Sequence, residues 1–213
     1  MESKDLKIKV IGIGGAGNNI VNSMNENKLD GVELYVANTD RQVLEKAEVQ
    51  NRICRGEYMM LTLVKPAFDD LWFREKLMAD EETMSYNARW GGTIPFPVDA
   101  WESWYESWVR NPGTDRYYRY LMNPENEYVG EIAYHYDELR DIYLCDVVIL
   151  AQYRNRGYGT DALQQLCTAA KKNGISVLHD DIAADNPSYK LFLKNGFDIE
   201  YQNEEVVMVK RDL

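Results

Sequence analysis

The most informative chemistry in the sequence is a pair of glycines, Gly157 and Gly159, placed between an apolar segment and an expected helix over 158–173. Glycine lets the backbone approach a ligand closely, and the first N–H groups of a helix have no acceptor within it. With the positive end of the helix dipole, these N–H groups form an anion site that suits a pyrophosphate. The spacing therefore predicts a phosphate cradle at residues 149–160.

A sheet and several helices must position this cradle. Period-two alternation of apolar residues, punctuated by glycine and proline, predicts strands at 61–64, 116–122, 128–136, 141–151, 175–180, 197–202 and 205–210. Apolar spacing of three and four predicts helices at 67–78, 80–86, 99–109, 158–173 and 187–195. Asp99 is the expected N-cap of the third helix.

A second motif follows the cradle, in which Asn186 opens a short helix that ends in Gly196-Phe197. Together with Arg154-x-x-Gly157-x-Gly159, this motif resembles the GNAT superfamily of N-acetyltransferases over about residues 60–213. The resemblance implies an α/β fold of the mixed α+β kind, with a mostly antiparallel central sheet flanked by helices. It also implies acetyl-CoA as co-substrate and transfer of an acetyl group to a primary amine of a small molecule or peptide.

The same resemblance assigns the binding roles. Main-chain N–H groups near the glycines would bind the CoA pyrophosphate, the strand end would pair with the pantetheine arm and polarise the thioester carbonyl, and Asn186 would bond near the pantetheine. Arg154 and Arg156 would either reach phosphates or lie in solvent as ordinary basic residues. The expected CoA-binding residues are Ile149, Leu150, Arg154, Asn155, Arg156, Gly157, Tyr158, Gly159, Thr160 and Asn186.

Proton transfer is less well specified by the motifs. Many family members place a tyrosine in the last helix to protonate the sulfur, and Phe192 occupies that position here. Tyr189, one turn earlier, is the candidate substitute acid. The alternatives are that Tyr189 only packs in the core, and that transfer proceeds without a dedicated acid. Glu131 is the candidate base, because strand alternation puts it on one face with His135, the second choice. The alternative for Glu131 is a surface or salt-bridged carboxylate.

An aromatic stripe precedes the central strands. Trp101, Trp104 and Trp108 have the spacing of one helix face, which is typical of core packing. The functional alternative is a wall of the acceptor pocket, where the aromatic rings together with Glu102 and Glu106 would suit a cationic amine.

The composition argues against several kinds of binding partner. The net charge of −11 argues against nucleic-acid binding, and no segment is apolar and long enough for a membrane span. Three scattered cysteines and two distant histidines predict free thiols and no metal site. We therefore expect a cytoplasmic bacterial enzyme whose partners are acetyl-CoA and an amine. A homodimer is compatible with the sequence.

The first part of the chain has its own glycine loop, Gly12-Ile-Gly14-Gly15-Ala-Gly17, followed by Asn38-Thr-Asp40. Over residues 6–50 it resembles the opening of FtsZ, the tubulin-like division GTPase. A second glycine-rich phosphate loop of that family is not found in the sequence, so we expect a β-α-β fragment without function at 1–55, before the GNAT domain at 60–213. The alternatives are an FtsZ-like GTP-binding protein and a non-catalytic CoA-binding or regulatory module.

Overall fold

A computed structural model describes residues 8–27, 29, 31–38, 43–44, 46–54 and 60–213. The chain divides into two units, Met1–Met59 and Met60–Leu213, and we describe each by itself. Residues 39–42, which belong to the FtsZ-like pattern, lie outside the described part. No helix of the described residues has the length and apolar character needed to cross a membrane.

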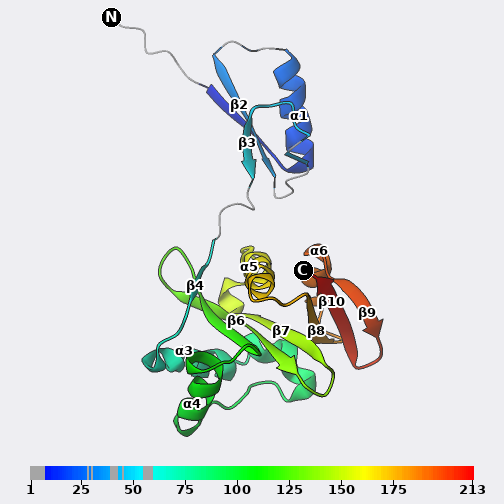
Figure 1. The fold of residues 1–213 in the computed structure, drawn as a ribbon. Coiled ribbons are helices and arrows are strands. Elements are labelled where there is room, and N and C mark those ends of the chain that lie inside the picture. Colours follow the sequence, from blue (N-terminus) through cyan, green and yellow to red (C-terminus); the bar gives the residue numbers. More distant parts are fainter. Residues whose placement is uncertain (1–7, 28, 30, 39–42, 45, 55–59) are drawn as a thin grey trace, which may run out of the picture. The chain divides into compact units, whose positions relative to one another are not determined.

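The first unit is a three-stranded parallel sheet with one helix. Its elements are β1 (Ile8–Ile13), α1 (Gly14–Glu26), β2 (Val32–Asn38) and β3 (Asn51–Cys54), in the sheet order β1-β2-β3 (Figure 1). The expected β-α-β unit is confirmed, and β3 is an addition that its short, partly polar sequence did not reveal. Val21 of α1 packs with Leu34 and Val36 of β2 in a small core, whereas Ile11 and Ile13 of β1 are exposed.

The second unit is built on a seven-stranded sheet with the order β4-β5-β6-β7-β8-β10-β9. Its strands are β4 (Thr62–Val64), β5 (Arg116–Met122), β6 (Tyr128–Asp137), β7 (Ile142–Ile149), β8 (Val177–Ala183), β9 (Asp198–Gln202) and β10 (Val206–Asp212). Its main helices are α3 (Leu71–Ala79), α4 (Val98–Tyr105), α5 (Tyr158–Lys172) and α6 (Tyr189–Lys194). The 3-10 helices are η1 (Phe68–Asp70), η2 (Thr83–Trp90) and η4 (Ala151–Tyr153), and a π-helical turn η3 (Glu106–Arg110) continues α4.

All neighbouring strands of this sheet are antiparallel except β7 and β8. Parallel strands need a crossover, which α5 supplies. The β7–β8 ladder consists of one pair, Leu144↔His179, near the start of β7. Beyond that pair no main-chain pairing among the described residues joins β7 to β8, so the two strands diverge. The cradle follows directly after β7. The expected mixed, mostly antiparallel fold is confirmed.

Two apolar cores cover the two faces of the sheet. One packs α5 and α6 against the face that carries Ile132, Cys145 and Ile149 (Figure 1). The other packs α3, η2 and α4 against the face that carries Tyr118, Ala133 and Val148. Because side chains alternate along a strand, Glu131 and His135 lie on the second face with Ala133.

The predicted N-cap of α4 was wrong. The helix begins at Val98 with Pro97 as the capping residue, so Asp99 lies in its first turn. Proline suits a helix start because the missing N–H would have no acceptor there.

Candidate functional site

The start of α5 presents unpaired main-chain donors. The first helical hydrogen bond runs from the Asp161 N–H to the Gly157 carbonyl, at 3.2 Å, and no side chain caps the helix. The N–H groups of Tyr158, Gly159 and Thr160 precede that bond and therefore have no acceptor within the helix. Since the positive end of the helix dipole lies here as well, the site suits a negatively charged group.

The two glycines of the motif meet different structural needs. Gly157 has φ +86°, a left-handed conformation that favours glycine, and a Cβ there would lie 2.9 Å from Cε of Met60. Gly159 has an ordinary φ, but its Cβ would lie 3.0 Å from Cδ2 of Leu191 on α6. Gly157 therefore permits the turn, and Gly159 permits close packing of α5 against α6.

The basic residues of the loop point to structural partners. The Arg154 guanidinium donates to the main-chain carbonyls of Thr83 at 2.6 Å and Glu82 at 3.4 Å. Arg156 donates to the Gln152 carbonyl at 3.3 Å and lies 5.2 Å from the centre of the Tyr153 ring. Arg154 therefore ties the loop to η2, while Arg156 stays at the surface beside the helix start. Between them, Asn155 adopts a positive φ of 62°.

At the end of β7, alternate residues direct their main-chain groups to opposite sides. The Leu150 N–H donates to the Val129 carbonyl at 2.9 Å, which makes Gly130↔Ile149 a non-hydrogen-bonded pair of the antiparallel ladder. The N–H and C=O of Ile149 consequently point away from β6, toward the diverging edge of β8. Of the two predicted residues, Ile149 has its main chain free to meet a ligand, and the Leu150 N–H is used within the fold.

Asn186 lies in the turn between β8 and α6. Its Oδ1 accepts a hydrogen bond from the Ser188 N–H at 2.9 Å, and its own N–H donates to the Ala183 carbonyl at 2.9 Å. Its side-chain N–H₂ group makes no hydrogen bond within residues 60–213, so it remains a donor for a ligand. Further along, Phe192 is buried against Phe197, with ring centres 5.1 Å apart. Tyr189 is half-buried and packs on the same core.

Glu131, the predicted base, lies in a buried ion pair. Its carboxylate accepts hydrogen bonds from Arg74 on one oxygen and from the Tyr118 hydroxyl on the other. Its side chain is 5% exposed and that of Arg74 is 16% exposed. Burial opposes the charge of Arg74, but Glu131 and Tyr118 hold the pKa of the guanidinium above its usual range. Both carboxylate oxygens are thus engaged within the protein.

Arg74 also contacts the aromatic residues that the sequence suggested as a wall of the acceptor pocket. Its guanidinium lies 4.6 Å from the centre of the Trp104 ring, 5.3 Å from that of Phe96 and 5.5 Å from that of Tyr118. Trp104 and Trp108 belong to the core around it, and the Trp101 N–H donates to the Phe96 carbonyl at 3.2 Å. The aromatic rings therefore surround a cation of the protein itself.

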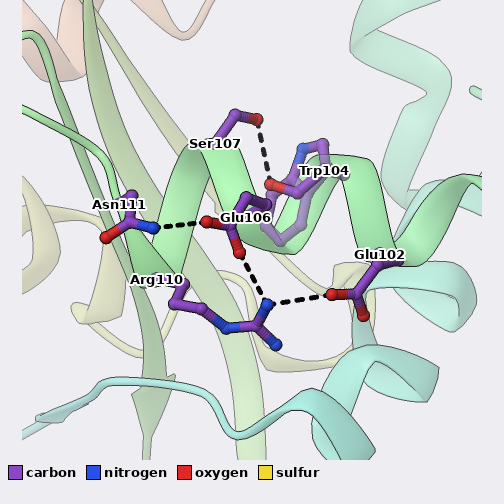
Figure 2. A network of polar contacts seen from close by, with 6 residues as sticks. All are labelled: Glu102, Trp104, Glu106, Ser107, Arg110 and Asn111. Carbon is purple, nitrogen blue, oxygen red and sulfur yellow. Dashed lines mark hydrogen bonds and ion pairs between the residues drawn. The ribbon is translucent and has the colours of Figure 1, made fainter.

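The acidic residues beside the stripe are paired as well, as Figure 2 shows. Arg110 contacts Glu102 at 2.9 Å and Glu106 at 2.6 Å, and Asn111 donates to the second oxygen of Glu106. The hydrogen bond from Asn111, followed by that from Arg110, lowers the pKa of Glu106. These carboxylates hold the π-helical end of α4 together.

One carboxylate on the same face of the sheet remains without a partner. Asp146 of β7 stands opposite Ala133 and therefore shares a face with Glu131 and His135. It is exposed and makes no hydrogen bond or ion pair within residues 60–213. Desolvation raises the pKa of its carboxyl, the charge of His135 opposes this rise, and the charge of Glu131 adds to it. The sequence reading missed Asp146, although a single charged residue inside an apolar strand is a visible signal.

Two further groups lie close to Asp146. Desolvation, followed by the charges of Asp146, Glu131 and Asp180, raises the pKa of the half-buried Tyr86 in η2. Burial and then the Asp146 charge raise the pKa of Asp180 on β8 well above its usual range. The structure therefore brings carboxylates from β6, β7 and β8 to the region where β7 and β8 diverge. His135 lies at its margin, with its ring 5.8 Å from that of Trp108.

Comparison with solved structures shows the same fold. PaiA N-acetyltransferase from Thermoplasma acidophilum, solved with coenzyme A, matches 72% of this chain and 99% of its own at TM-score 0.52 and 16% identity. Spermidine N-acetyltransferase from Vibrio cholerae, solved with CoA and spermine, matches 72% and 95% at TM-score 0.58 and 16% identity. A GNAT-family acetyltransferase from Bacillus anthracis matches 72% and 95% at TM-score 0.56 and 20% identity.

The N-terminal region of the chain matches a different group of proteins. The FtsZ cell division protein of Aquifex aeolicus is 40% identical over 95 residues, and that of Magnetospirillum gryphiswaldense is 50% identical over 50 residues. The matched regions cover 40% and 24% of this chain but only 26% and 9% of those relatives. The predicted likeness to part of FtsZ is confirmed, and the chain spans about a quarter or less of these proteins' length.

The family of the second unit follows from a match along most of its length. The family model described as an acetyltransferase (GNAT) domain matches residues 60–198, which include β7, the glycine loop, α5 and α6. The chain belongs to the GNAT acetyltransferase family.

Proposed function

We propose that residues 60–213 transfer an acetyl group from acetyl-CoA to a primary amine of a small molecule or peptide. The proposal rests on one observation, that two neighbouring segments each present main-chain groups without a partner in the fold. The N–H groups at the start of α5 have no helical acceptor, and the Ile149 main chain points to the diverging edge of β8. One set suits a pyrophosphate, and the other suits an extended arm that ends in a thioester.

In this proposal acetyl-CoA is a co-substrate held mainly by the backbone. Tyr158, Gly159 and Thr160 donate to the pyrophosphate, with Asn155, Arg156 and Gly157 shaping the turn and Arg154 anchoring it to η2. The Ile149 N–H meets the pantetheine arm or the thioester carbonyl, and Leu150 fixes its orientation through the bond to Val129. The free amide of Asn186 donates to the pantetheine.

The reaction proceeds by direct transfer. The amine nitrogen forms a bond to the thioester carbon, the carbon–sulfur bond breaks, and the sulfur leaves with the electron pair as a thiolate. The nitrogen must give up a proton, and the thiolate must gain one. Glu131 is the sequence-based candidate for proton acceptor and Tyr189 for proton donor, and both roles stay predictions. Glu131 is paired with Arg74 and Tyr189 packs on the core, which disfavours both roles. Asp146 is a second proton acceptor, with its carboxylate free.

An amine acceptor also agrees with the electrostatics of this face. Asp146 and Glu131 lie on this face, and the Asp146 charge also raises the pKa of Asp180 on β8, so carboxylates outnumber Arg74 in this region. A positively charged amine would reduce their mutual repulsion. Two of the similar structures carry names that specify N-acetyltransferases, one of them for spermidine.

The test is release of free thiol from acetyl-CoA by the full chain, measured across polyamines, amino acids and aminoglycosides. We expect turnover with at least one amine and an acetylated product of matching mass. Tight binding of acetyl-CoA with no turnover on any amine would contradict catalysis and would favour a CoA-binding regulatory module.

A further inference from the structure

A pocket of about 360 Å³ lies at the edge of the second unit's sheet, at the start of β5. Its lining comes from η3 and the loop after it, from β5 and β6, and from the residues that follow β4 and α5. The lining residues are Lys65, Trp108, Val109, Pro112, Gly113, Thr114, Arg116, Tyr117, Tyr118, Arg119, Tyr134 and Asn173. None of the residues assigned above to acetyl-CoA is among them.

The charges of this pocket are all of one sign. Lys65, Arg116 and Arg119 line it, and no acidic side chain does, although the chain carries a net charge of −11. The side chains of Lys65 and Arg116 make no ion pair or hydrogen bond within residues 60–213. Arg119 donates to the Tyr118 carbonyl at 2.6 Å but has no carboxylate partner. Arg116 and Arg119 leave β5 on opposite faces, opposite His135 and Ile132, so the pocket lies around the free edge of this strand. The three cations that line it repel one another unless an anion joins them.

Aromatic rings hold the two arginines in place. The Arg116 guanidinium lies 5.5 Å from the centre of the Trp108 ring, and that of Arg119 lies 4.5 Å from that of Tyr117. Guanidinium groups stacked on aromatic rings keep their N–H donors directed outward, and their planar geometry matches phosphate and carboxylate oxygens. The pocket therefore has preset donors rather than freely moving surface charges.

An alternative reading gives the arginines a protective role. β4 pairs with β5 only from Tyr120 to Met122, so Arg116–Arg119 lie outside that pairing, and charged side chains discourage another strand from adding to a free sheet edge. This reading explains arginine at an edge. It does not explain the pocket, or why Lys65 from a different segment also lines it.

We propose that this pocket binds a small organic polyanion that carries phosphate or carboxylate groups. Its volume falls at the lower end of the range for small-molecule sites, which suits a compact ligand. Arginine and lysine together accommodate two or more negative charges, and the ring faces of Trp108 and Tyr117 flank the ligand.

The experiment measures binding of pyrophosphate and of citrate to the full chain by calorimetry, with and without saturating CoA. We expect binding that persists when CoA is present, and a melting temperature that rises with ligand concentration. The anion that binds more tightly identifies phosphate or carboxylate as the preferred group. The double variant R116A/R119A should weaken binding at least tenfold and leave CoA affinity unchanged.

The matched control removes two exposed positive charges elsewhere, in K76A/K194A, which should bind both anions as the unaltered protein does. Equal weakening in both double variants would overturn the proposal, since net charge alone would then explain binding. Anion binding that CoA abolishes would also overturn it, because the anions would occupy the cradle. If R116A/R119A does not fold, the single exposed variant K65A should still weaken binding severalfold, and unchanged binding would contradict the pocket assignment.

Discussion

Arg74 and Glu131 form a buried ion pair between α3 and β6, and the same guanidinium lies against the rings of Trp104, Phe96 and Tyr118. One arginine thereby engages both features that the sequence suggested for the acceptor, the carboxylate and the aromatic stripe. We therefore propose that the acceptor amine lies along β7, near the unpaired Asp146.

Removing Arg74 should destabilise the protein strongly. Arg74→Met keeps much of the side-chain volume but leaves the buried Glu131 charge without its cation, which costs about 3–5 kcal/mol. Urea denaturation measures this loss. Arg110→Met is the matched control, because its pairs with Glu102 and Glu106 are exposed to solvent and their loss should cost far less. Similar losses in both variants would contradict a special role for the buried pair.

Asp146 and Glu131 can be separated by the dependence of the rate on pH. A carboxylate base works only when ionised, so kcat/KM should rise with pH as the base loses its proton, and a raised pKa places that rise above the usual aspartate range. We expect Asp146→Asn to lower kcat/KM by about 10²–10⁴-fold and to remove this rise. Glu131→Gln should keep the rise while lowering stability. The reverse pattern would identify Glu131 as the base.

Asp180 should destabilise the folded protein at neutral pH. The pKa of Asp180 is raised in the folded protein, so folding favours the protonated carboxyl. This contribution to stability is fully present below the unfolded pKa of about 4, and it is lost as the pH rises through the folded pKa. Asp180→Asn should therefore raise the melting temperature at pH 7–8, by roughly 2–4 °C for each kcal/mol relieved. At pH 3.5 the two proteins should melt alike. A variant less stable than the parent at pH 8 would contradict this sign.

Tyr189→Phe tests the proton donor. The Tyr189 ring packs on the core, and its hydroxyl makes no hydrogen bond within residues 60–213. A thiolate is also a fair leaving group, so we expect kcat to change less than about twofold, far below the 10²–10⁴-fold effect of a lost general acid. Loss of kcat with KM unchanged would instead assign the acid role to Tyr189.

The cradle could be predicted from sequence because its causes are local. An apolar strand, a residue that tolerates positive φ and a helix start occupy consecutive positions, so Gly157 and Gly159 carry the signal themselves. Local spacing likewise placed the central strands within a few residues of their observed ends. The start of α4 was misjudged because Pro97 and Asp99 are both plausible at a helix start.

The acceptor face could not be predicted in the same way because its contacts are distant in sequence. Arg74 and Glu131 are 57 positions apart, and nothing in the pattern around either residue indicates the other. The pairing of Leu150 with Val129, which leaves Ile149 facing β8, likewise depends on register. The position of Asp146 inside an apolar strand was the one available clue to an acidic group there.

The most direct test of acetyl-CoA binding by the cradle is a calorimetric titration of the full chain and of Gly157→Glu. The positive φ at this position and the nearby Met60 side chain disfavour any larger residue, and a carboxylate would occupy the site of the pyrophosphate. Gly157→Ala adds no charge, so it reports the backbone cost, about 1–2 kcal/mol of stability, together with the contact of the new Cβ with Met60. We predict one acetyl-CoA per chain for the unaltered protein, weakened binding for Gly157→Ala, and none for a folded Gly157→Glu. Equal affinity in Gly157→Glu and the unaltered protein would contradict the cradle.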